Sequence, residues 1–194
     1  MPFNLPTRLT ISRIAIVPVI VVLLMFPGRW TCFAATLLFS AAGLTDLLDG
    51  RLARKTNQIT SLGKFLDPLA DKILVSSALI MLVQNAWVPG WIAVLIICRD
   101  ILVTGLRAAA AQEGVVIAAD RHGKFKTVLQ IVAVAVLLLH YDLAGIPVHD
   151  LGMLILYFSL ALTLFSGYNY FRTFYREREG EGNPAGPMRD NGLP

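Results

Sequence analysis

The chain has 194 residues, of which 56% are hydrophobic and only 15% are charged, and its mean hydropathy is +0.64. Soluble domains average about 45–50% apolar and about 25% charged residues, so the composition excludes a soluble globular domain, a disordered chain, a coiled coil and a secreted disulfide scaffold. The formal net charge is +4, from 17 Lys and Arg against 13 Asp and Glu. This length predicts one domain.

Six apolar segments follow one another along the chain. A membrane-spanning helix requires about 20 mostly apolar residues. The candidates are residues 11–26, 32–48, 65–83, 88–111, 127–141 and 151–170. The sequence therefore predicts an all-α protein, an integral membrane bundle of six transmembrane helices over residues 1–175. Residues 176–194 are rich in Gly, Pro, Asn and charge, and they are predicted to form a flexible cytoplasmic tail.

The basic residues orient this predicted bundle. Six spans place both termini on one side, and 14 of the 17 Lys and Arg residues lie there or in the connections that share that side. Arg29 alone lies on the opposite side, while Lys72 and Arg99 lie within spans. The positive-inside rule assigns the basic side to the cytoplasm. We therefore expect a protein of the cell inner (plasma) membrane, and the charge asymmetry removes the need for a nucleic-acid partner.

Four carboxylates interrupt the apolar pattern. Most acidic residues lie outside the spans, but Asp46 and Asp49 lie near the cytoplasmic end of the second span, and Asp67 and Asp71 near the cytoplasmic start of the third. Spacings of three and four place each pair on one helix face, and a short connection lets the pairs face each other. A charge within a span costs about 2.5–3.5 kcal/mol, so a positive group must offset the four.

Two interpretations of the aspartates remain. They are ordinary helix-end acids paired with neighbouring Arg and Lys, or they bind a hard divalent cation, which prefers oxygen ligands. Four acids suffice for two ions about 3.5–4 Å apart, an arrangement that clamps a phosphate ester. Small residues Gly50 and Ala53 permit either close approach of a bulky ligand or helix–helix packing. Arg54, one turn beyond Gly50, is able to form a bidentate contact with phosphate.

The spacing of these residues resembles the signature of the CDP-alcohol phosphotransferase family. The matching positions, over 26 residues, are Asp46-Leu-Leu-Asp49-Gly50-Arg-Leu-Ala53-Arg54, then Gly63 after eight residues, then Asp67 and Asp71 after three residues each. The resemblance implies a six-helix membrane enzyme, usually a homodimer. It also implies a CDP-linked donor, release of CMP, and two Mg²⁺ or Mn²⁺ ions held by the aspartates, with Asp71 also accepting the hydroxyl proton.

The resemblance also assigns substrate-binding residues. Those implied for the nucleotide and diphosphate of the donor are Gly50, Ala53, Arg54 and Thr60. The flanking segments Arg99-Asp100, Gly105-Leu-Arg107 and Gly123-Lys124-Phe-Lys126-Thr127 resemble members of the family whose acceptor is glycerol 3-phosphate, although many relatives have Glu where Asp100 stands. The implied reaction is phosphatidyl transfer from CDP-diacylglycerol to glycerol 3-phosphate. The phosphate of this acceptor needs cations, and the candidates are Arg107, Lys124, Lys126 and Arg99.

Other functions remain open from the sequence. The nearest alternative is the same chemistry with another acceptor, such as inositol phosphate, serine or a second phosphatidylglycerol. An intramembrane prenyltransferase also binds diphosphate through Mg²⁺ and paired aspartates, but on well-separated helices. A divalent-cation transporter would place its acids near the middle of the membrane, and a structural membrane adaptor would leave the four acids unexplained. Membrane lipids are expected partners in each case.

Overall fold

The computed structural model describes residues 5–56, 61–112, 121–142, 145 and 147–181, with the side chains of residues 11–45, 69–106, 108–110, 126–142, 145 and 147–172. All regular structure in this part of the chain is helical. The helices are α1 (Leu5–Met25), α2 (Arg29–Thr56), α3 (Ser61–Gln84), α4 (Gly90–Gln112), α5 (Arg121–Leu139) and α6 (Val148–Glu181). Each predicted apolar segment overlaps one of these helices, which confirms the all-α prediction.

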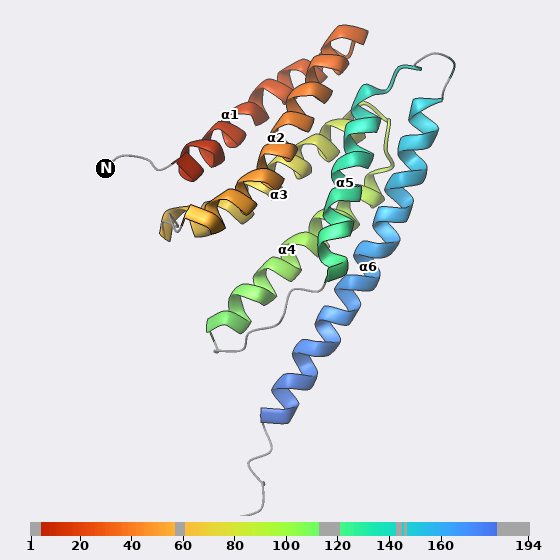
Figure 1. Ribbon diagram of the computed structural model, residues 1–194. Helices are drawn as coiled ribbons and strands as arrows, with labels where there is room; N and C mark the ends of the chain where they lie inside the picture. The colour runs from red at the N-terminus through yellow and green to blue at the C-terminus, as the bar shows by residue number, and fades with distance from the viewer. Residues whose placement is uncertain (1–4, 57–60, 113–120, 143–144, 146, 182–194) are drawn as a thin grey trace, which may run out of the picture.

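Consecutive helices run in opposite directions along one bundle (Figure 1). The α1–α2, α3–α4 and α5–α6 connections lie at one end. α2 and α4 terminate at the other end, and α3 and α5 begin there. We call this second end the motif end, because the predicted aspartates lie towards it. Helix α1 packs against α2 and α3, α5 packs against α2 and α6, and α4 packs against α3 and α6.

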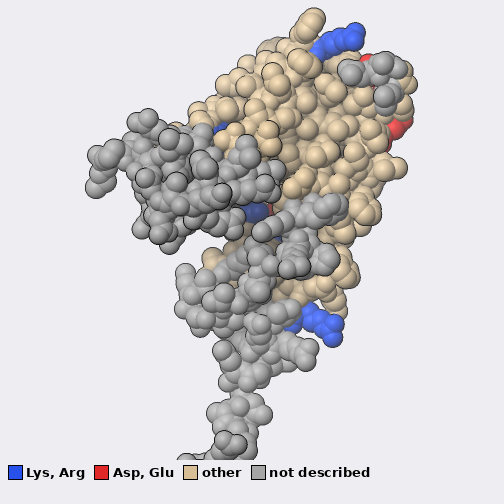
Figure 2. All heavy atoms as spheres, in the orientation of Figure 1, with Lys and Arg blue, Asp and Glu red and all other residues tan. Residues whose placement is uncertain are grey.

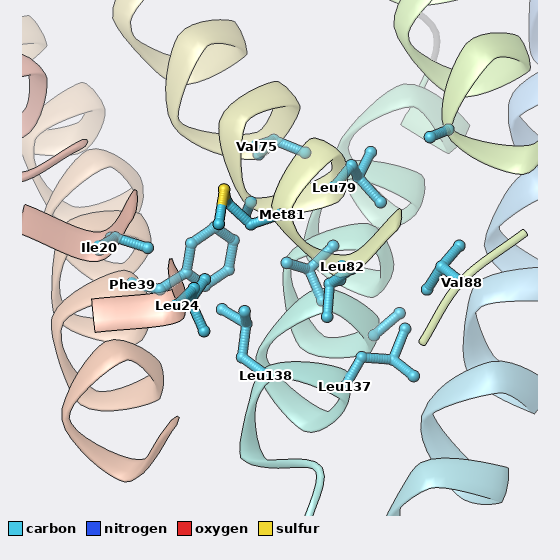
Figure 3. Close-up of a cluster of buried hydrophobic side chains, with 14 of the residues drawn as sticks. Ile20, Leu24, Phe39, Val75, Leu79, Met81, Leu82, Val88, Leu137 and Leu138 are labelled. Carbon is cyan, nitrogen blue, oxygen red and sulfur yellow. The ribbon is translucent and has the colours of Figure 1, made fainter. Parts of the chain in front are cut away.

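Buried side chains from several helices meet in the middle of the bundle. Ile20 and Leu24 of α1 lie beside Phe39 of α2, and Leu82 of α3 lies near Leu138 of α5 (Figure 3). Each of these side chains is at most 2% exposed. Removing one such side chain from water stabilises a fold by about 1.5–3 kcal/mol. This core holds together α2 and α3, the helices that carry the four aspartates described above.

The outside of the bundle is also apolar. Leu154, Phe165 and Tyr168 of α6 are 66–68% exposed, and Val94 and Ile101 of α4 are each 59% exposed. In the view of Figure 2, most of the described surface carries neither a basic nor an acidic side chain. Exposed apolar area on this scale is typical of a surface that contacts lipid or another protein.

One helix in the described part of the chain is long and apolar enough to cross a membrane. It covers Val148–Arg172 of α6, with a hydropathy of 1.7. The apolar stretches Ile11–Met25 and Lys126–Leu139 are shorter. In α4, Arg99 and Asp100 interrupt the apolar run. The six predicted helices are thus present as helices, while their assignment as six spans stays a prediction.

The last helix is longer than the sequence pattern indicates. Helix α6 continues to Glu181, whereas the flexible tail was predicted to begin at residue 176. The residues in between are mainly Arg and Glu, which have high helix propensity and prolong a helix that has already formed. The remainder of the predicted tail, 182–194, lies outside the described residues.

Helices α5 and α6 approach each other closely at Gly152. A β-carbon on Gly152 would lie 2.8 Å from Cγ of Leu137 and 3.2 Å from its backbone nitrogen. The change Gly152→Ala is therefore expected to lower the free energy of unfolding by about 1–3 kcal/mol, because backbone must move. The matched change Gly105→Ala, in α4 with no atom within 4 Å, should raise it by about 0.5–1 kcal/mol. Unfolding in detergent, followed by circular dichroism, measures both; equal effects would contradict this packing.

Two histidines and a tryptophan pack at the end opposite the motif end. The ring of His140 stacks on Trp87, with centroids 3.8 Å apart, and lies 5.3 Å from the ring of His149. His140 follows the last residue of α5 and has a φ of 52°. Burial lowers the pKa of His140 from its ordinary 6.5, the nearby His149 lowers it further, and Asp142 opposes both.

This lowered pKa predicts a loss of stability in acid. Because the unfolded chain binds the proton more tightly, the contribution of His140 is present above about pH 6.5 and is lost as the pH falls below that value. Thermal unfolding in detergent between pH 7.5 and 5.5 should show the decline. The variant His140→Asn, whose side chain tolerates a positive φ, should show a shallower decline. An unchanged slope would contradict the prediction.

Candidate active site

The aspartate motif lies entirely within two helices. Although the second apolar segment was predicted to end at residue 48, α2 continues to Thr56. It therefore carries Asp46, Asp49, Gly50, Ala53 and Arg54 on one unbroken helix, and the first four of these recur at the i, i+3, i+4, i+7 spacing of a single face. Thr60, which was also predicted to bind the donor, lies outside the described residues. The side chains of Asp46, Asp49, Ala53 and Arg54 are not described either.

Helix α3 supplies the other pair, Asp67 and Asp71, in its first half. Asp71 is half-buried and has an interaction partner in the fold. Four carboxylates form an oxygen-only donor set, which fits Mg²⁺ or Mn²⁺ better than softer metals. Among the side chains that the structure describes, no group of three or more metal-binding residues occurs. The side chains of Asp46, Asp49 and Asp67 are outside that set, so the metal site stays a prediction.

Arg13 is buried in the structure, although the sequence did not single it out as a site residue. We counted it with the basic residues of the cytoplasmic side, but its side chain is 3% exposed and has an interaction partner. It belongs to α1, which packs against α2 and α3. A buried guanidinium is not a surface anchor. Its position inside the predicted apolar segment 11–26 was the feature of the sequence that could have indicated this burial.

A second polar cluster joins α4, α5 and α6. We call it the Asp100 cluster, and its members are Arg99, Asp100, Lys126, Gln130 and Ser166. Nη1 of Arg99 and Nζ of Lys126 each donate to Oδ1 of Asp100 at 3.0 Å, and Nε2 of Gln130 donates to Oδ2 at 3.4 Å. Nη2 of Arg99 donates to the Ser166 hydroxyl at 3.1 Å. Three helices are thus connected through one carboxylate.

The Asp100 cluster is buried and carries excess positive charge. The side chains of Arg99, Asp100 and Lys126 are 13%, 18% and 7% exposed. Two cations and one carboxylate leave a formal charge of +1. Helix α6 fits closely here, because a β-carbon on Gly167 would lie 3.2 Å from Nε of Arg99. A partly buried site with one excess positive charge is suited to binding an anion.

The structure brings together two of the four residues predicted to bind the acceptor phosphate. Arg99 and Lys126 share a carboxylate, while the side chains of Arg107 and Lys124 lie outside the described residues, on α4 and α5. The side chain of Lys126 is only 7% exposed, so it lies inside the bundle and not on its surface. The sequence analysis named Asp100 only as part of a flanking motif and gave it no role, although it lies within the predicted apolar segment 88–111.

Comparisons with known proteins show which proteins this chain resembles. Residues 3–165 match the family model described as CDP-alcohol phosphatidyltransferase. A protein of Bacillus subtilis named CDP-diacylglycerol–glycerol-3-phosphate 3-phosphatidyltransferase is 44% identical, covering 87% of this chain and 94% of the relative. Proteins with the same name from Rickettsia typhi and Shigella flexneri are 41% and 38% identical, covering 87% and 88% of this chain and 96% and 94% of their own lengths.

The family match covers the aspartate motif, the Asp100 cluster except Ser166, and five of the six helices in full. Members of the family depend in general on divalent cations and are associated with membranes. These properties agree with the oxygen-only donor set and with the apolar helix Val148–Arg172. The chain belongs to the CDP-alcohol phosphatidyltransferase family.

Proposed function

We propose that this chain transfers a phosphatidyl group from CDP-diacylglycerol to glycerol 3-phosphate, giving phosphatidylglycerophosphate and CMP. The observation that carries the proposal is the identity of 38–44%, over nearly the whole chain, to proteins named for this reaction. The buried cations of the Asp100 cluster support a phosphate-bearing acceptor. Serine, an alternative acceptor, carries no phosphate for them to bind.

The transfer requires an attacking oxygen and a departing nucleotide. The primary hydroxyl of glycerol 3-phosphate attacks the phosphorus that bears diacylglycerol, the bond between this phosphorus and the CMP oxygen breaks, and the hydroxyl proton passes to Asp71. Asp46, Asp49 and Asp67, together with Asp71, would hold two Mg²⁺ or Mn²⁺ ions. When bound, these ions supply neutralisation of the diphosphate charge. The protein itself contributes the relative position of the two substrates.

The remaining site residues bind the two substrates on either side of the aspartates. Gly50 and Ala53 leave room beside α2 for the nucleotide and diphosphate, and Arg54 and Thr60 donate hydrogen bonds to them. On the acceptor side, the dianionic phosphate is bound by cations of α4 and α5. These cations are Arg107, Lys124, Lys126 and Arg99.

The membrane arrangement belongs to the same proposal. Six helices span the cell inner membrane as one catalytic domain over residues 1–175, and both termini lie on the cytoplasmic side, as does the motif end. The acyl chains of the donor stay in the bilayer, while the water-soluble acceptor enters from the cytoplasm. The chain acts as a homodimer among membrane lipids. The exposed apolar surface of α4 and α6 supports contacts of this kind.

The test is an assay with purified protein in detergent. CDP-diacylglycerol is supplied with glycerol 3-phosphate, inositol phosphate, serine or phosphatidylglycerol, each with Mg²⁺ and with EDTA, and both CMP and the lipid product are identified. We expect Mg²⁺-dependent CMP release with glycerol 3-phosphate only. Product from another acceptor would reassign the substrate, and metal uptake into vesicles without CMP release would contradict the enzymatic function.

A further inference from the structure

The Asp100 cluster contains a carboxylate that has no part in the transfer chemistry described above. Asp100 holds Nη1 of Arg99 and Nζ of Lys126 on one oxygen, each at 3.0 Å. The two cationic nitrogens therefore lie at most about 6 Å from each other. Like charges this close in a poorly solvated site repel strongly, and the carboxylate between them offsets that repulsion.

We propose that Asp100 is a positioning residue of the acceptor site, which keeps the ammonium of Lys126 beside the guanidinium of Arg99 so that both bind the phosphate of the acceptor. This inference rests on the proposed function. Asp100 does not contact the reacting atoms. It determines the affinity for glycerol 3-phosphate through the cations that it holds.

The donor inventory leaves room for the phosphate. An ammonium has three N–H donors and a guanidinium has five. Among the described residues, Lys126 donates one of its three N–H groups to Asp100, while Arg99 donates to Asp100 and Ser166 and makes a further interaction. Both oxygens of Asp100 are also occupied, because Gln130 donates to Oδ2. The carboxylate is thus fixed from α4 and α5, and the cluster of two cations and one carboxylate keeps a formal charge of +1, which favours an anion.

Without the negative charge, the two cations would separate. The aliphatic stem of Lys126 has four rotatable bonds, so its ammonium would turn away from Arg99 towards water. Arg99 would stay near its position, since Ser166 and the close contact with Gly167 hold it against α6. The acceptor phosphate would then lose one of two adjacent charged partners.

The test is Asp100→Asn, which keeps the shape of the side chain and removes its charge. We expect the KM for glycerol 3-phosphate to rise about tenfold or more, as for the loss of a hydrogen bond to a charged group. The kcat and the KM for CDP-diacylglycerol should change by less than about threefold, since the aspartate motif is unaltered. Asp100→Glu, which keeps the charge, should restore the acceptor KM to within about threefold. Asp150→Asn, the same change at an exposed site of α6, is the matched control.

A double-mutant cycle distinguishes positioning from a general structural role. If Asp100 acts through Lys126, then Asp100→Asn should raise the acceptor KM much less in a Lys126→Met background than in the wild type. Independent, multiplicative effects would overturn the proposal. So would an acceptor KM that is unchanged or lowered by Asp100→Asn, because a lower value would mean that Asp100 competes with the phosphate.

A variant that fails to fold and a wild type that is inactive lead to different conclusions. If Asp100→Asn does not fold, Gln130→Leu becomes the deciding variant, because it removes only the amide that fixes Oδ2. An acceptor KM about threefold higher is then expected, and an unchanged KM overturns the proposal. If the wild type releases no CMP with glycerol 3-phosphate, the proposed function itself fails. A failure of the positioning role alone leaves an active wild type with variants of unchanged KM.

Discussion

The variant Asp71→Asn is expected to lower kcat for CMP release by about 10²–10⁴-fold, the usual contribution of a positioned general base. Asparagine has the shape of aspartate but does not accept a proton at neutral pH, and its neutral amide is a poorer ligand for a divalent cation. Asp71 is suited to this role because α3 holds it half-buried, in register with Asp67 four residues earlier. The measurement is single-turnover CMP release with both substrates and Mg²⁺ saturating.

Saturating Mg²⁺ distinguishes a role of Asp71 as a base from a role in binding the metal ion. If Asp71 only helped to bind the ion, excess Mg²⁺ would restore turnover, so full activity of Asp71→Asn at high Mg²⁺ would remove it from the base role. Asp150→Asn serves again as the matched control, since Asp150 is exposed in the first turn of α6 at the end opposite the motif end. The secondary structure of the variant is compared by circular dichroism.

Removal of divalent cations is expected to abolish CMP release, and Mg²⁺ or Mn²⁺ should restore it. The physical reason is the charge on the aspartates: four carboxylates on two adjacent helices repel each other and the diphosphate of the donor unless cations lie between them. In Asp46→Asn, the Mg²⁺ concentration for half-maximal activity should rise about tenfold or more. Titration of the EDTA-treated enzyme with Mg²⁺ measures this shift.

Two results would contradict the metal prediction. One is full activity of EDTA-treated protein that elemental analysis shows to be free of divalent metal. The other is an Asp46→Asn variant whose Mg²⁺ dependence matches that of the wild type. In either case the aspartates would be paired with Arg and Lys instead, as the ordinary interpretation of helix-end acids requires.

The helices were predictable because their apolar runs are long and interrupted at few points. Pro89-Gly90 marks the start of α4, and the polar pair Gln84-Asn85 marks the end of α3. The extents of α2 and α6 were not predictable from hydropathy, since both continue through charged residues, to Thr56 and Glu181. The Arg, Lys and Glu residues in those final turns have high helix propensity, which favours continuation of a helix that has already formed.

The aspartate motif was predictable from spacing, but the Asp100 cluster was not. A period of three to four residues is a property of one helix, so Asp46 with Asp49 and Asp67 with Asp71 are visible in the sequence alone. Asp100 and Lys126 are 26 residues apart and meet only because α4 and α5 both pack against α6. The sequence shows an acid beside Arg99 in an apolar run, but it does not show that Lys126 would pair with this acid.

The absence of a side chain at Gly167 has a consequence for acceptor selection. Because Arg99 occupies the space beside this glycine, a larger residue there would push the Arg99 side chain away from α6. In the proposed assignment, such a shift would alter the room left for the head of the incoming alcohol. The final helix would thereby act as a spacer that tunes which alcohol fits, without touching it.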